Sequence, residues 1–168
     1  MNKKMVARAI FLILVIGTLI TIFAFSSQGG IQSKSVSRTV MREIVDINPK
    51  TKYLSDVEKE RIVEESQPFI RKTAHFTIYM VLGMMVMGFC STYDLNWKKK
   101  LIITILCGLI YAVSDEIHQG FTGDGRTPKV FDVCVDTLGT LTGAFIMLGG
   151  IRFVKYGLNS KILKFSNK

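Results

Sequence analysis

The sequence predicts an all-α integral membrane protein with four transmembrane helices and a helical segment between the first two. The main observation is that 48% of the 168 residues are hydrophobic, and that they gather in runs long enough to cross a bilayer core of about 30 Å. A second observation is that the prolines fall outside these runs, as expected of helices that must keep their backbone hydrogen bonds in lipid. These prolines are Pro49, Pro68 and Pro128.

We expect a single domain, 1–168, with spans at about 9–25, 73–91, 101–119 and 130–151. The first run follows basic residues, as a secretory signal would. Its apolar stretch is longer than the usual signal core, so we expect it to be retained as a span. The cysteines lie singly in separate spans without CxxC spacing, which argues against a disulfide framework and against a thiolate zinc site.

Lysine and arginine are concentrated at one side of this four-span arrangement. They are Lys3, Lys4, Arg8, Lys98, Lys99, Lys100, Arg152, Lys155, Lys161 and Lys164. Because basic residues near span ends prefer the cytoplasm, we expect both termini to be cytoplasmic and the lipid bilayer to be the main partner. The same residues account for most of the +9 net charge. No soluble basic face is evident, so nucleic-acid binding is not expected.

The connection at 26–72 is charged and is expected to be extracytoplasmic. Apolar residues recur there at helical spacing, and Lys34, Arg38 and Arg42 mark another face at four-residue steps. We therefore expect an amphipathic helix on the outer membrane surface. Ser55 and Glu58 have the spacing of a capping box, which predicts a second short helix to about residue 65, before Pro68 interrupts it. The apolar set is Val36, Val40, Met41, Ile44, Val45 and Ile47.

Polar and charged side chains enter the apolar spans at three places, all expected in the outer leaflet. A charge at bilayer depth costs at least about 2.5 kcal/mol, so such groups are expected to pair with one another or to surround something that they bind. The Gly139-x-x-x-Gly143 spacing on the fourth span permits close helix approach, which would press the Asp136 face against its neighbours. The three stretches are Arg71 to Tyr79, Ser114 to Gln119, and Gly125 to Asp136.

Two interpretations of this cluster remain open. In one, the cations and acids are structural ion pairs that lock the helices together. In the other, the number of groups and the titratable His75 indicate a polar pocket. A zinc or manganese site is conceivable, but no spacing is as specific as HExxH, and we predict no metal and no other cofactor. The conceivable ligands are His75, Glu116, Asp132 and Asp136.

The motifs RKxxHFxxYxxLG, SDExHQxF and GRxxxxxDVxxDxxG, in this order, resemble those of VanZ-like membrane proteins. The end of the first span, at residues 25–28, is similar to that family's first motif. The resemblance implies a bacterial cytoplasmic membrane protein of the cell envelope, and its name-giving member is associated with lowered susceptibility to glycopeptide antibiotics of the teicoplanin kind. It does not imply a reaction.

Our leading hypothesis is that the outer pocket binds or processes an anionic, lipid-linked envelope component or a glycopeptide-related ligand. Whether the chain is an enzyme, a binding or transport protein, or a non-catalytic assembly factor stays open, as does its oligomeric state. Candidate acid, base or carboxylate groups for catalysis are His75, Asp115, Glu116, Asp132 and Asp136. Candidate substrate-binding groups are Ser27, Gln28, Arg71, Lys72, Tyr79, Gln119 and Arg126.

Overall fold

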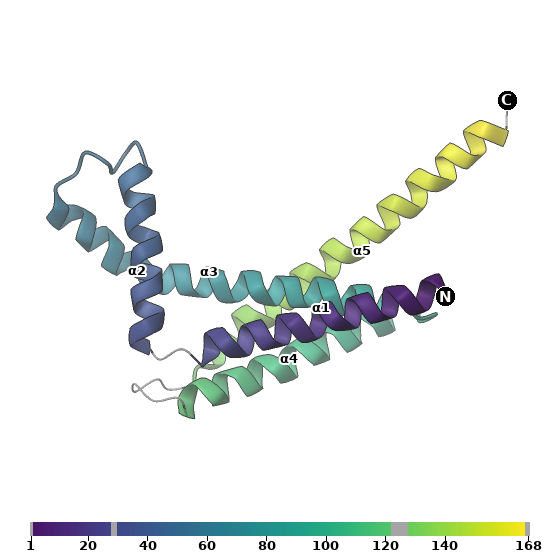
Figure 1. Cartoon of the computed structure of the whole chain (residues 1–168), viewed down its shortest axis with the longest axis horizontal. Helices are drawn as coiled ribbons and strands as arrows, with labels where there is room; N and C mark the ends of the chain where they lie inside the picture. The colour runs from purple at the N-terminus through teal and green to yellow at the C-terminus, as the bar shows by residue number, and fades with distance from the viewer. Residues whose placement is uncertain (1, 28–29, 122–127, 167–168) are drawn as a thin grey trace.

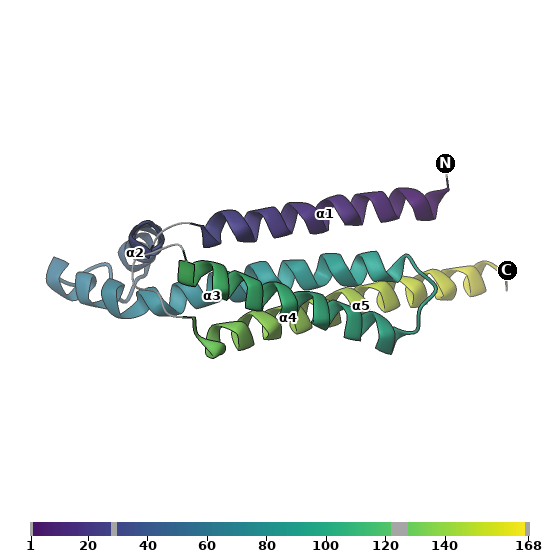
Figure 2. The ribbon, with the colours of Figure 1, turned by 90° about the horizontal axis from the view of Figure 1, so that it is seen from below.

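The computed structural model describes residues 2–27, 30–121 and 128–166, which form five helices and no strands. In order these are α1 (Lys3–Ser26), α2 (Gly30–Ile47), α3 (Asp56–Ser91), α4 (Trp97–Phe121) and α5 (Val130–Ser166). All except α2 contain a stretch long and apolar enough to cross a membrane, which confirms the predicted class and the four spans. Helices α1, α3 and α4 run side by side along the long axis, α5 slants away from them towards its C-terminal end, and α2 lies across the axis (Figures 1 and 2).

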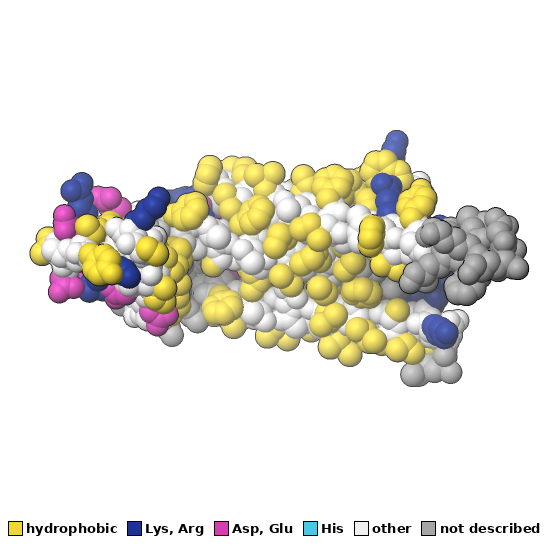
Figure 3. All heavy atoms as spheres, turned by 90° about the horizontal axis from the view of Figure 1, so that it is seen from above, with side chains coloured by type: hydrophobic (Ala, Val, Ile, Leu, Met, Phe, Trp, Pro, Cys, Tyr) yellow, Lys and Arg dark blue, Asp and Glu magenta, His cyan; other side chains and the backbone are white. Residues whose placement is uncertain are grey.

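The two ends of the bundle differ. At one end, which we call the α2 end, lie α2, the first turns of α3 and the C-terminal end of α4 (Figure 1). Both chain termini lie at the opposite end, the terminal end. On the face drawn in Figure 3, apolar side chains cover the middle of the bundle, acidic and basic side chains mix at the α2 end, and the charged side chains at the terminal end are basic.

The α3 helix is the centre of the fold, because it packs against each of the other four helices. Its closest partner is α5, and glycines make that approach possible. A methyl group on Gly139 or Gly143 would overlap the backbone carbonyl oxygen of Phe76 or Met80. The predicted role of these glycines in close helix approach is therefore confirmed.

One expectation about α3 is wrong. The short helix that starts at the Ser55–Glu58 capping box does not end before Pro68 but continues without a break through the second span to Ser91. Proline removes one backbone donor, which leaves the carbonyl of Glu64 without its usual partner. Both Glu64 and Pro68 are exposed, so water can satisfy this carbonyl, and packing on α2 holds the turn in place.

The α2 helix is held on the first part of α3 by a small core and by ion pairs. Val45 and Val63 are buried between the two helices. Lys59 Nζ lies 2.8 Å from Asp46 Oδ1, and Arg42 Nη2 lies 2.8 Å from Asp56 Oδ1. The remaining apolar stripe of α2 is exposed, as an amphipathic helix on a membrane surface would require. It consists of Val36, Val40, Ile44 and Ile47.

Glycine packing predicts a sharp contrast between two positions of α5. Gly143→Ala forces the Met80 backbone to move, whereas Gly149 has no atom within 4 Å of an added methyl group. We expect Gly143→Ala to lower the free energy of unfolding by about 1–3 kcal/mol. Gly149→Ala should leave it unchanged or slightly raised. Thermal unfolding of both variants in detergent measures the difference, and equal melting temperatures would contradict the packing described for α3 and α5.

Acid is expected to loosen α2 from α3. The hydrogen bond from Lys59, followed by the charges of Lys59 and Arg42, holds the pKa of the Asp46 carboxyl below its usual value. A lowered pKa stabilises the fold above the unfolded value of about 3.9, and this contribution is lost as the pH falls through the folded value. Hydrogen exchange of α2, corrected for intrinsic rates, should therefore quicken between pH 5 and pH 3. A smaller increase is expected in Asp46→Asn; an identical increase would contradict this role for Asp46.

Candidate functional site

Three helices bring polar side chains together inside the bundle near the α2 end. Asp115 lies six residues before the last residue of α4, and Asp136 lies six residues after the first residue of α5. At 1.5 Å per residue, each carboxylate is about 9 Å inside its helix end. His75 of α3 lies beside Asp136. The predicted convergence of three distant stretches of the chain is thus present in the structure.

The inner part of this cluster is His75, Asp115 and Asp136. His75 Nδ1 lies 3.7 Å from Asp136 Oδ2. One nitrogen of the imidazole and one oxygen from each carboxylate all lie within 4.8 Å of one another. Asp115 and Asp136 are 6% and 2% exposed, and His75 is partly buried. We call these three residues the inner triad.

Two hydrogen-bonding side chains adjoin the inner triad. Gln119 Nε2 donates to Asp115 Oδ2 over 3.1 Å, which fixes the orientation of that carboxylate. Tyr79 is fully buried, and the carboxylates of Asp115 and Asp136 are its electrostatic neighbours. Its hydroxyl lies beside the Asp115 carboxylate but makes no well-formed hydrogen bond with a described residue.

The other two predicted carboxylates have partners of their own closer to the α2 end. Lys72 Nζ lies 2.6 Å from Asp132 Oδ1 and 4.0 Å from the centre of the Phe131 ring. Glu116 Oε1 accepts a 2.6 Å hydrogen bond from the backbone N–H of Lys129, just before α5 begins. These two contacts tie α3 to α5 and α4 to the start of α5, so they have an evident structural role.

Of the remaining predicted binding residues, one lies close to the inner triad, one lies outside it, and two fall outside the described residues. Arg71 lies one turn before His75, partly buried, and its Nε atom is buried without a hydrogen-bond partner among the described residues. Ser27 is exposed, donates to the carbonyl of Phe23, and lies 3.2 Å from His118 Nε2, outside the inner triad. Gln28 and Arg126 lie outside the residues that the structure describes.

Ser26 was not among the predicted site residues, although it is buried and its hydroxyl has no described partner. Ile22, one turn earlier, packs in the same core as Tyr79 and Ala112. One further turn towards the α2 end brings Ser26 to the depth of the inner triad. The helical spacing of the buried face of α1, which runs through Leu19 and Ile22 to Ser26, would have identified it.

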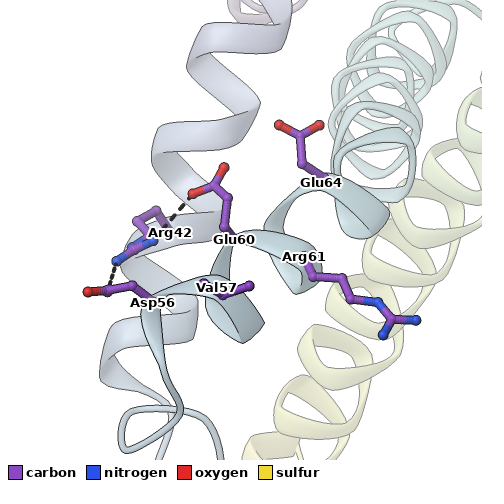
Figure 4. Close-up of a pocket in the computed structure, with 6 residues that line it drawn as sticks. All are labelled: Arg42, Asp56, Val57, Glu60, Arg61 and Glu64. Atoms are coloured by element: carbon purple, nitrogen blue, oxygen red, sulfur yellow. Dashed lines mark hydrogen bonds and ion pairs between the residues drawn. The ribbon is translucent and has the colours of Figure 1, made fainter.

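A surface hollow between α2 and α3 is a different feature. It is open, and Arg42 turns towards Asp56 and Glu60 within it (Figure 4). Its nearest α3 residue to the inner triad, Glu64, is eleven residues before His75, or about 16 Å along the helix. The hollow is lined by the ion pairs that hold α2, and its charges are already paired.

Four apolar spans with titratable groups buried between them define a multi-pass helical membrane protein. The chain belongs to the VanZ/LLP1 family, whose profile matches residues 11–153. The matched range contains α2, α3, α4 and every residue of the inner triad. Comparison with curated proteins and with solved structures found no match.

Proposed function

We propose that this envelope protein binds an anionic, lipid-linked component of the bacterial cell envelope at the α2 end of the bundle. The observation that carries the proposal is the buried Arg71 Nε atom, which has no acceptor among the described residues, one turn from the inner triad. A guanidinium group matches the geometry of phosphate and carboxylate oxygens, and burying its donors without an acceptor is costly. An anionic headgroup would supply that acceptor.

The distribution of charge supports a position for the headgroup nearer the α2 end than the inner triad. Asp115 and Asp136 repel an anion at the depth of the inner triad. Arg71 and Lys72 begin the preceding turn, about 6 Å closer to the α2 end. The headgroup would therefore bind at Arg71 and Lys72, with its acyl or isoprenoid chain along the apolar outer surface of the spans.

In this proposal the α2 end faces out of the cell and both termini lie in the cytoplasm. The terminal end carries basic side chains on the face seen in Figure 3, in accord with the preference of basic flanks for the cytoplasm. The headgroup site would then open to the outer leaflet of the cytoplasmic membrane, where lipid-linked wall precursors are used. Retention of such a precursor would lower susceptibility to glycopeptides of the teicoplanin kind.

A second candidate is an assembly protein whose buried charges are only structural. The Lys72–Asp132 pair and the Glu116–Lys129 hydrogen bond favour it, because both connect helices. The two candidates differ over Arg71. If the cluster is only structural, no ligand needs to bind at Arg71. A headgroup site, in contrast, requires a ligand at Arg71.

The discriminating test compares two arginines of α3. Arg61 is exposed and paired with Glu65 on the first turns of the helix, so Arg61→Ala is a matched control for Arg71→Ala. Native mass spectrometry of protein extracted from bacterial membranes should find an anionic lipid bound to the unmodified chain and to Arg61→Ala. We expect at least a tenfold lower occupancy in Arg71→Ala, from the loss of a charge-assisted contact worth about 1.5–3 kcal/mol.

The cellular counterpart measures teicoplanin susceptibility in a susceptible Gram-positive host. Expression of the unmodified chain and of Arg61→Ala should raise the inhibitory concentration, and Arg71→Ala should not at equal membrane abundance. Equal lipid occupancy in the two arginine variants would contradict the headgroup site and favour the structural candidate. If no chain changed the susceptibility, the proposed effect on teicoplanin susceptibility would be contradicted, but the proposed lipid binding would not.

A further inference from the structure

The inner triad has the composition and spacing of a metal site. We propose that His75, Asp115 and Asp136 together bind one divalent transition-metal ion, Zn²⁺ or Mn²⁺. An imidazole nitrogen and two carboxylate oxygens suit these ions, and three protein ligands leave coordination positions open for water or another ligand. From the sequence we predicted no metal, and the ligands that were conceivable were a different set. The structure assigns Asp115 to the triad and gives Glu116 and Asp132 other partners.

The distances in the triad are close to those of a loaded site. Ligand bonds of about 2.0–2.2 Å place two ligand atoms at most about 4.4 Å apart. His75 Nδ1 and Asp136 Oδ2, at 3.7 Å, already lie within this limit. The widest separation in the triad is no more than 4.8 Å, and ligand atoms around a tetrahedral ion lie about 3.4 Å apart, so side-chain movements of about 1 Å would complete the set.

Unpartnered buried atoms around the triad are the second, independent observation. Ser26 is 2% exposed and its hydroxyl has no hydrogen-bond partner among the described residues, and the Tyr79 hydroxyl, 0% exposed, lies beside the Asp115 carboxylate of the triad without a well-formed hydrogen bond. Asp136 Oδ1 is likewise buried without one. A polar group that is buried without a hydrogen-bond partner destabilises the fold. An ion that ligates Asp136 and carries one or two waters would give acceptors and donors to all three.

Charge leads to the same conclusion. Asp115 and Asp136 are both buried, and His75 is the cation-forming side chain beside them. Lys72, three residues before His75, is paired with Asp132 instead, and Arg71 lies one turn before His75 and forms no ion pair with either triad aspartate among the described residues. Two carboxylates against one imidazole leave negative charge in the bundle interior, where an uncompensated ion is expensive. A divalent cation neutralises it, and the hydrogen bond from Gln119 to Asp115 orients a ligand as outer partners of metal sites commonly do.

This inference does not depend on the proposed headgroup site, since the triad can hold an ion with or without a lipid at Arg71. The test uses the full-length, tag-free protein in detergent, stripped with a chelator and titrated with Co²⁺ and then Zn²⁺. We expect visible Co²⁺ absorption bands that saturate at one ion per chain and disappear when Zn²⁺ displaces the cobalt. Zn²⁺ should also raise the melting temperature of the unmodified protein.

Asp132→Asn is the matched control for Asp136→Asn, because the two aspartates lie one turn apart on α5 and only Asp136 belongs to the triad. We expect Zn²⁺ affinity to fall at least 100-fold in Asp136→Asn and to stay within about threefold in Asp132→Asn. If Asp136→Asn does not fold, the Co²⁺ absorption bands of the unmodified chain test the metal site without the variant. Their absence, or an equal loss of affinity in both variants, would overturn the proposal.

Discussion

The close approach of α3 and α5 is the constraint on which the rest of the structure depends. Gly139 and Gly143 meet the backbone carbonyls of Phe76 and Met80, where no larger residue fits. This contact fixes the depth of one helix against the other. It thereby places Asp136, one turn before the glycine stripe, beside His75. The polar cluster is a consequence of backbone packing, and ion pairing alone would not set its register.

The charged side chains between α3, α4 and α5 are arranged in two layers. Nearer the α2 end, Lys72 pairs with Asp132 and Glu116 meets the backbone before α5, which compensates these groups locally. Deeper in the bundle, the inner triad and its neighbouring hydroxyls keep unsatisfied atoms. Structural ion pairs explain the first layer. The second layer keeps buried polar atoms that helix packing alone does not satisfy, so a bound ligand or ion is the simplest account of it.

The sequence was sufficient for the class, the four spans and the convergence of three polar stretches, because hydropathy and helical spacing report these directly. It did not distinguish Asp115 from Glu116, since neighbours on a helix differ in direction by about 100° and only packing decides which one faces His75. It also misjudged Pro68, because the rule that proline ends a helix ignores the support that α2 gives to the exposed turn. Ser26 lies in the 25–28 motif, but Ser27 and Gln28 were chosen from it, because the motif alone does not say which serine continues the buried face of α1.

The most direct test of this account is a thiol cross-link between α3 and α5 in the membrane. In a chain whose native cysteines are replaced by serine, His75→Cys with Asp136→Cys should be joined by a short bifunctional thiol reagent. Thr73→Cys with Leu138→Cys, at exposed positions of the same helices, should not be. Efficient linking of the first pair alone is the predicted result. Failure of the first pair in a folded protein, or equal linking of both, would contradict the register of α3 and α5 and the site built on it.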